Sequence, residues 1–251
     1  MKRGFTLIEL VVALGVIAIV THLAVRELTK FGEAKLTKAA DAQLEEVRSA
    51  AVAFLADTGR LVRAEDGTLS ELWQMPTNLT AYAARSVKAG DKTVYVPSGW
   101  RGPYLKLPLG KSSLRDAWGN ALEYRTGDEY ERLSLSNGFA VAVSHYGPSA
   151  LLKDRRKLSL LPEGGATSSV VMLVLKEDGV LDNPNIVAFG PDGKGGVVSA
   201  TNTVSIGLQT KLTGSFTPGE RVFVLRNGDT VLETRQITLR PGDNFVEFKM
   251  Q

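Results

Sequence analysis

Residues 2–25 read KRGFTLIELVVALGVIAIVTHLAV, and this stretch decides how the rest of the chain is organised. Residues 5–25 are apolar and hold one formal charge, Glu9. As a helix rising about 1.5 Å per residue, this run measures about 31 Å, which matches a hydrocarbon layer of about 30 Å. Lys2 and Arg3 precede the run, so the positive-inside rule places the N-terminus in the cytoplasm and the rest of the chain across the membrane. The sequence therefore predicts a single-pass membrane helix.

A cleaved secretory signal is the alternative interpretation of this run. The apolar part of such a signal usually holds about 7–15 residues and ends at a small-x-small cleavage site. Here the apolar run is longer, and charged Arg26 and Glu27 follow it. A membrane anchor fits the length better, but an ordinary anchor does not explain a carboxylate inside it.

Glu9 is the most informative residue of the apolar run. A carboxylate within a membrane helix costs about 2.5–3.5 kcal/mol or more, so such groups usually have a partner. Lys2 and Arg3 stand on the cytoplasmic side, and Arg26 is about 25 Å away along the helix. Two interpretations stay open: Glu9 reaches the headgroups or takes up a proton, or it pairs with a cation from another molecule.

The helix is predicted to continue beyond the membrane. Residues 26–57 contain no proline and are rich in Ala, Leu, Glu and Lys, which favour helices. Apolar residues three or four positions apart form one stripe, which we expect to pack against a globular head: Ala40, Leu44, Val47, Ala51 and Phe54. Gly59 is the predicted C-terminal cap. The sequence thus predicts one helix from residue 5 to about 56.

The remaining sequence alternates turn signals with short strand-like runs. A helical turn is expected near residues 68–73. The predicted strands are 92–96, 121–125, 139–143, 203–208, 211–216, 221–226, 230–238 and 244–248. Asn227-Gly228-Asp229 lies between two of them and is a strong hairpin signal. The predicted fold class is α+β, with the long N-terminal helix packed on an antiparallel β-sheet head and a C-terminal all-β extension.

The composition argues against several classes of function. The chain has 251 residues, no cysteine, and 30 Lys+Arg against 27 Asp+Glu, a formal net charge of +3. Disulfides, thiol catalysis and Cys-ligated zinc are excluded, and no dense basic run indicates nucleic-acid binding. The two histidines, His22 and His145, are interpreted as an interfacial residue and as strand-end packing. We see no nucleophile–base–orienter set and predict no enzymatic activity.

The segment from Lys2 to Leu10 resembles the leader and mature start of a type IV pilin or a type II secretion pseudopilin. The resemblance implies that a prepilin peptidase cuts after Gly4 and that the new N-terminus, Phe5, is methylated. It also implies a homo-oligomeric fibre, assembled through an inner-membrane platform, in which Glu9 pairs with the Phe5 amine of a neighbouring subunit. Such an amine has a pKa near 7.7–8.0 and is largely cationic at neutral pH.

Two motifs in the middle of the chain extend the resemblance to the head of the major pseudopilin. They are Gly-Pro-Tyr-Leu at 102–105 and Asp-Ala-Trp-Gly-Asn at 116–120, where Ala117 stands in place of a proline. The residues that carry the match are Gly102, Pro103, Tyr104, Trp118, Gly119 and Asn120. We expect Trp118 to bury a large apolar area against the helix.

The segment 189–196 is similar to a pseudopilin loop that precedes a calcium-binding acidic pair. No acidic pair follows Asp192 here, and calcium takes about six to eight oxygen ligands. Asp178 and Asp182 are too generic to supply the missing ligands. Asp192 is therefore interpreted as a turn residue. No cofactor is predicted, and calcium stays a weak alternative.

These observations predict an organisation and a function. The leader is 1–4, the long helix 5–57 with a transmembrane part at 5–25, the pilin-like head 58–196, and the C-terminal β extension 197–251. We predict a structural subunit of a type II secretion pseudopilus or type IV pilus-like fibre. It would lie in the bacterial inner membrane before assembly and in a periplasmic or extracellular fibre afterwards.

Three alternatives stay open. The chain could be a minor, adhesin-like tip pilin, or a signal-anchored envelope enzyme or binding protein. A DNA-uptake pilus is also left open, because these fibre systems share the same N-terminal chemistry.

Overall fold

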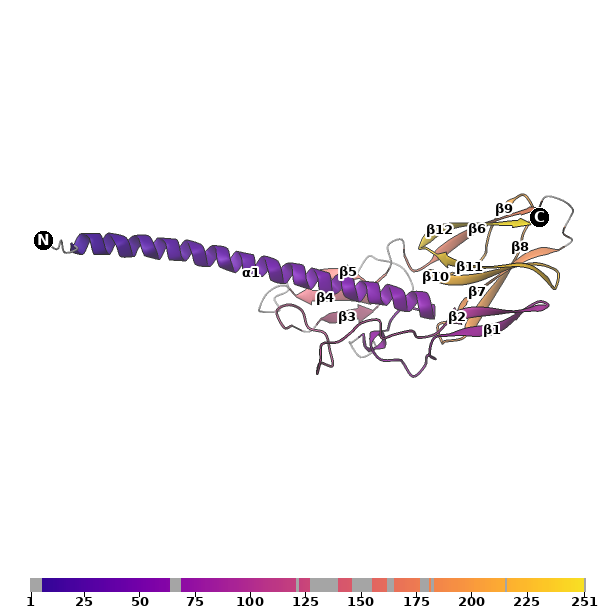
Figure 1. Ribbon diagram of the computed structural model, residues 1–251, viewed down its shortest axis with the longest axis horizontal. Coiled ribbons are helices and arrows are strands. Elements are labelled where there is room, and N and C mark those ends of the chain that lie inside the picture. The colour runs from indigo at the N-terminus through magenta and orange to yellow at the C-terminus, as the bar shows by residue number, and fades with distance from the viewer. Residues whose placement is uncertain are drawn as a thin grey trace.

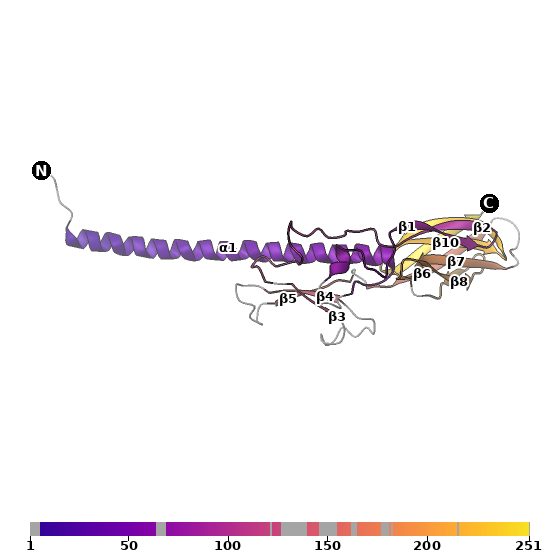
Figure 2. The same cartoon turned by 90° about the horizontal axis from the view of Figure 1, so that it is seen from below.

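The computed structural model describes residues 6–63, 69–120, 122–126, 140–145, 155–161, 165–176, 181, 183–214 and 216–250. Between residues 123 and 159 it describes the backbone of three strands. Figures 1 and 2 show one long helix whose first half projects away from the rest of the molecule, with the N- and C-termini at opposite ends.

Helix α1 (Leu7–Thr58) has 52 residues. It ends at Gly59, which adopts the left-handed conformation with φ 77° and donates its N–H to the carbonyl of Leu55 at 2.9 Å. A glycine is favoured there because it has no Cβ to clash in that conformation. The predicted helix and its glycine cap are confirmed.

The second half of α1 carries the predicted apolar stripe into the core. Its buried residues are Ala40, Leu44, Val47, Ala50, Ala51, Phe54, Leu55 and Thr58. Leucines from the irregular region around the short 3₁₀ turn η1 (Ser70–Leu72) pack on this stripe, including Leu69, Leu72 and Leu105. The helix is therefore the central element of one hydrophobic core.

The remaining described elements are strands. They are β1 (Ala83–Ala89), β2 (Lys92–Ser98), β3 (Glu123–Thr126), β4 (Ala140–His145), β5 (Arg155–Ser159), β6 (Ser168–Lys176), β7 (Pro184–Pro191), β8 (Val197–Thr203), β9 (Gln209–Lys211), β10 (Gly219–Asn227), β11 (Thr230–Leu239) and β12 (Gly242–Met250). They form sheets of order β1-β2, β3-β4-β5, β11-β10-β7-β8 and β12-β6-β9. The predicted α+β class is confirmed.

The sheets at the C-terminal end stack in layers, with the four-stranded sheet in the middle (Figure 1). Successive side chains of a strand point to opposite faces, so β7 and β10 supply two cores. Ile186 and Phe223 face β6 and β12, whereas Val187 and Val222 face the β1–β2 hairpin. The two central strands of this sheet, β7 and β10, are buried on both faces, which explains their nearly continuous apolar runs.

Two predicted strands differ from the structure. The runs 203–208 and 211–216 are not strands over those lengths; the chain instead forms β8 and the short β9. The Asn202 side chain accepts a hydrogen bond from Thr213 N–H at 2.7 Å and donates one to the Thr213 carbonyl at 3.2 Å. Val204 and Phe216 are buried without forming a continuous ladder. Their apolar character reflects core packing, which sequence alone does not distinguish from a strand.

Among the ladders between the described strands, the one formed by the C-terminal strand is parallel. The predicted β10–β11 hairpin is confirmed. After it the chain crosses between sheets, and β12 pairs with β6 in parallel. The division at residue 197 stays a prediction; strands from both sides of it, such as β7 and β10, pair within one sheet.

Candidate assembly and processing site

Thr6 and Glu9 form a closed pair at the start of α1. Thr6 is the N-cap, and its hydroxyl accepts a hydrogen bond from Glu9 N–H at 3.3 Å. In return, Glu9 Oε2 accepts hydrogen bonds from Thr6 N–H at 2.9 Å and from the Thr6 hydroxyl at 2.8 Å. This is a capping box, which satisfies backbone donors that the first helical turn leaves without partners. The carboxylate of Glu9 is therefore folded back to the beginning of the helix.

Thr6 was missed when the sequence was interpreted, although the sequence contained its signal. A Ser or Thr followed three positions later by Glu, just before an apolar run, is the signature of a capping box. The interpretation of Glu9 considered only cations as partners. In the described residues, its hydrogen-bond partners are the neutral donors of Thr6.

The predicted processing residues, Gly4 and Phe5, lie outside the described residues. They directly precede Thr6 in the sequence. Cleavage after Gly4 would thus create an N-terminal amine on the residue next to the cap.

Every residue from Thr6 to Phe31 is exposed in the single chain, including Ile8 at 71% and Ile17 at 60%. Among the residues that the structure describes, α1 is the one helix long and apolar enough to cross a membrane, judged by length and composition. Its most apolar window has a mean hydropathy of 2.4, and none of that window is buried. Soluble monomers rarely expose so large a continuous apolar surface, so this half of the helix needs lipid or other apolar helices around it.

Polar groups within the exposed apolar run are bonded locally. The Thr21 hydroxyl donates to the carbonyl of Ile17 at 2.7 Å. Such a bond within the helix keeps a hydroxyl from being left unpaired in hydrocarbon. His22 follows directly and is exposed, like every residue of this part of the helix, so its interfacial role stays a prediction.

Charged residues begin immediately after the apolar run. Lys30 Nζ lies 2.9 Å from Glu27 Oε1, and Lys35 Nζ lies 4.5 Å from the ring centroid of Phe31. Exposed pairs of this kind add about 0–1 kcal/mol to stability. Their position marks where the helix surface changes from apolar to aqueous.

The Gly-Pro-Tyr-Leu motif anchors the end of α1 to the head. The Tyr104 hydroxyl donates to Asp57 Oδ2 at 3.1 Å and accepts from Arg101 N–H at 2.9 Å. Its ring meets Phe54 edge-on, with ring centroids 5.7 Å apart. Burial raises the pKa of both the Tyr104 hydroxyl and the Asp57 carboxyl above their ordinary values. Tyr104 thus joins the last turn of α1 to the loop that carries the motif.

Gly102 and Pro103 shape the loop in front of Tyr104. The Gly102–Pro103 peptide bond is cis. A Cβ at position 102 would lie 2.4 Å from the Trp100 ring, so this close approach requires glycine.

The Asp-Ala-Trp-Gly-Asn motif is a turn built on Asp116. Asp116 Oδ1 accepts from Trp118 N–H at 3.0 Å and from Asn120 N–H at 2.8 Å, and Gly119 N–H donates to the Asp116 carbonyl at 3.0 Å. Trp118 itself is half-buried. The partly buried aromatic side chains packed on the helix core include Trp73, Trp100 and Tyr104.

Asp192 has the same local geometry as Asp116. Its Oδ1 accepts from Lys194 N–H at 2.7 Å and from Gly196 N–H at 2.8 Å. Its carboxylate is thereby used within the turn. Over the described residues, no group of three or more His, Cys, Asp or Glu side chains is placed to hold a metal ion.

The structure does not describe the side chains of three other residues that the sequence brings into question. Asp178 and Asp182 lie outside the described residues. His145 ends strand β4, and its side chain also lies outside the described part.

Comparison with known proteins agrees with the chemistry of the N-terminus. Residues 1–25 match the family model described as the prokaryotic N-terminal methylation motif. This motif is the signature of the prepilin-type N-terminus of type IV pilins and pseudopilins, so the predicted resemblance is confirmed. No curated protein matches the chain.

The motif has general implications for this chain. It supports a pilin-like precursor. Proteins that carry this motif are structural rather than enzymatic, and in general a prepilin peptidase processes them and they assemble into pilus-like fibres. Together with the apolar half of α1, it fits a membrane-anchored envelope protein.

Proposed function

We propose that this chain is the precursor of a structural subunit of a type II secretion pseudopilus or a type IV pilus. A prepilin peptidase removes residues 1–4 and methylates Phe5, and the mature chain leaves the inner membrane to join a fibre. One observation carries the proposal: the exposed apolar run of α1, residues 7–25, holds a single formal charge, Glu9, which is folded against the helix start beside the cleavage point.

The capping box leaves part of the Glu9 carboxylate available to a neighbour. Both hydrogen bonds from Thr6 fall on Oε2. An ionised carboxylate has about four lone-pair sites over its two oxygens. Oε1 can therefore accept from the cationic Phe5 amine of an adjacent subunit, and the pair removes two charges from an apolar bundle.

The same arrangement accounts for the transfer from membrane to fibre. Lipid tails are as apolar as leucine, so the hydrophobic effect does not favour contacts between helices over contacts with lipid. Close packing and polar contacts between the helices drive their association instead. A charge pair between Glu9 and a neighbouring amine would be such a contact, and it would fix the stagger of adjacent helices.

Processing tests this proposal most directly. In a cell that assembles fibres, mass spectrometry of the native chain should find N-methylated Phe5 as the first residue. Gly4→Leu should block cleavage, keep the chain in the membrane and remove it from fibres. Gly32→Leu is the matched control, because it places the same side chain in open space farther along the helix and should be processed normally. An intact Met1 in fibre-assembled material would refute the proposal.

A minor subunit at the fibre tip is a second candidate. Figure 1 shows the sheets that contain residues 197–250 at the end of the molecule opposite the N-terminus. In a fibre whose core is built from α1, that end would lie on the outer surface of the fibre or at its tip. Counting copies in purified fibres separates the roles: a main subunit makes up most of the mass, and a tip subunit only a few copies.

A further inference from the structure

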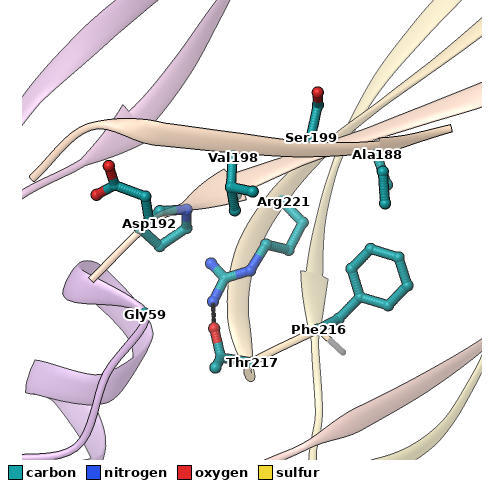
Figure 3. Close-up of a pocket in the computed structure, with 11 residues that line it drawn as sticks. Gly59, Ala188, Asp192, Val198, Ser199, Phe216, Thr217 and Arg221 are labelled. Carbon is teal, nitrogen blue, oxygen red and sulfur yellow. Dashed lines mark hydrogen bonds between the residues drawn. The ribbon is translucent and has the colours of Figure 1, made fainter. Parts of the chain in front are cut away.

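A cleft of about 410 Å³ opens where the end of α1 meets the four-stranded sheet. Gly59 borders it on the helix side, strands β7 and β8 form its floor, and Phe216, Thr217 and Arg221 form the opposite wall (Figure 3). This volume lies within the range of about 300–1,000 Å³ typical of small-molecule sites.

Arg221 is a buried cation at this cleft, with 1% of its surface exposed. Nη1 donates to the carbonyls of Ala56 and Glu220, and Nη2 donates to the Pro218 carbonyl at 2.8 Å and to the Thr217 hydroxyl. All these acceptors are neutral. In the described part of the chain, no carboxylate forms an ion pair with this guanidinium.

Two donors at the cleft have no acceptor among the described residues. A guanidinium has five N–H groups, and the bonds above use the four on Nη1 and Nη2, so the Nε–H is left. The Thr217 hydroxyl accepts from Arg221 and keeps its own proton to donate. Both residues line the cleft.

Apart from Asp192 and Ser199, the rest of the lining is apolar. Ala188, Gly190 and Ala200 leave room above the strands, and Phe216 supplies an aromatic wall. A Cβ on Gly190 would lie 2.8 Å from Arg221 Cδ and 3.0 Å from Nε, so glycine is what lets the arginine side chain lie against β7. The one acid of the lining, Asp192, points its carboxylate away from Arg221 in Figure 3.

The charge of Arg221 determines which kind of ligand the cleft can bind. Burial lowers the pKa of Arg221 to about 10, so the side chain stays cationic at neutral pH. It is the only cationic residue of the lining, and the carboxylates of Asp57 and Glu220 already offset part of its charge, which suits a monoanion rather than a doubly charged phosphate. Hydrogen bonds from a charged donor to a carboxylate are about twice as strong as neutral ones.

We propose that this cleft binds the carboxylate of an apolar acid, either a free acid or the C-terminus of a peptide. The Arg221 Nε–H and the Thr217 hydroxyl donate to the carboxylate, and the apolar part of the ligand lies on Ala188 and Ala200 against Phe216. This binding activity is separate from fibre assembly through α1.

The test is calorimetric titration of the full chain in detergent micelles. The probes are N-acetyl-phenylalanine, a peptide ending in phenylalanine with a free carboxylate, and the amidated form of each. Because Arg221 also bonds to the end of α1, the blocking variant is Val198→Trp, which fills the cleft from an exposed position and leaves the arginine in place. Thr201→Trp is the matched control, since it puts the same side chain on the opposite face of β8.

At least one acid should bind with a Kd of about 1 mM or tighter, and its amide should bind about tenfold more weakly. Val198→Trp should lose about tenfold in affinity for the acid, whereas Thr201→Trp should match the parent chain. Binding of the small acid alone identifies a free acid as the ligand, and binding of the peptide alone identifies a C-terminus; binding of both supports the shared chemistry. Absence of binding by both acids, equal binding of acid and amide, or full binding by Val198→Trp would overturn the proposal.

Discussion

Replacing Glu9 with alanine separates two contributions of this side chain. Within one chain, the change removes the reciprocal half of the capping box, namely the two hydrogen bonds that Glu9 Oε2 accepts from Thr6. The backbone N–H of position 9 can still donate to the Thr6 hydroxyl, so the loss of helix stability at the first turn is about 0.3–1.5 kcal/mol. The rest of the 52-residue helix keeps its own hydrogen bonds, so insertion into the membrane should persist. Insertion should even become easier, because a carboxylate within a membrane helix costs about 2.5–3.5 kcal/mol.

Between chains, the expected loss is larger. Removing one member of a buried ion pair costs about 3–5 kcal/mol, because the other charge is left unpaired. At about 1.4 kcal/mol per tenfold, this corresponds to a loss of between two and nearly four orders of magnitude in incorporation into a fibre beside other subunits. Glu9→Gln should lose nearly as much, because it keeps the size of the side chain and removes the charge.

Thr6→Ala is the control that isolates the cap. It removes the hydroxyl that bonds to Glu9 but keeps the carboxylate. The assay is co-expression of variant and parent subunits at equal membrane levels, followed by mass spectrometry of sheared fibres to count each form. If Glu9→Ala enters fibres as well as the parent chain, or if Thr6→Ala loses as much as Glu9→Ala, the pairing argument is refuted.

Two further outcomes follow from the head. Phe54→Ala should destabilise the head by about 3–5 kcal/mol, because the ring is fully buried beside Tyr104. Urea unfolding followed by circular dichroism measures this loss. Phe31→Ala, at an exposed position, should leave the unfolding midpoint nearly unchanged. Burial raises the pKa of Asp57 above its ordinary value of 3.8, so the folded state binds more protons than the unfolded state just above that pH. The contribution of Asp57 to stability should therefore fall as pH rises through the raised pKa, and Asp57→Asn should remove this part of the pH dependence; an unchanged pH profile would show that Asp57 does not carry it.

Much of this protein could be read from local patterns. The apolar run, the stripe from Ala40 to Phe54 and the Gly59 cap each depend on residues close together in the sequence. The hairpin around Gly228 is local in the same way. Thr6 belongs to this group too, since its relation to Glu9 spans three positions and the capping-box pattern is local.

Other features depend on segments that are far apart. Strand β12 pairs in parallel with β6, and the paired residues are more than seventy positions apart in the sequence. A local apolar pattern can predict a strand, but it does not specify the strand with which it pairs. The failure of the predicted strand 211–216 has the same origin, because Phe216 is buried by the opposite sheet rather than by a ladder of its own.

The sequence by itself determined that this chain has a long helix, with an apolar first part for lipid or other helices and a second part for a head. It also determined that the one charge in the apolar run, residues 5–25, is an acid near the predicted processing point. Helical periodicity, hydropathy and a short motif encode these features because each acts within a few turns of one element. Only the tertiary structure brought Arg221 to the carbonyl of Ala56 and left one of its N–H groups facing a cleft. That arrangement requires a helix end, two strands and a loop to meet, and the packing of distant segments decides where they meet.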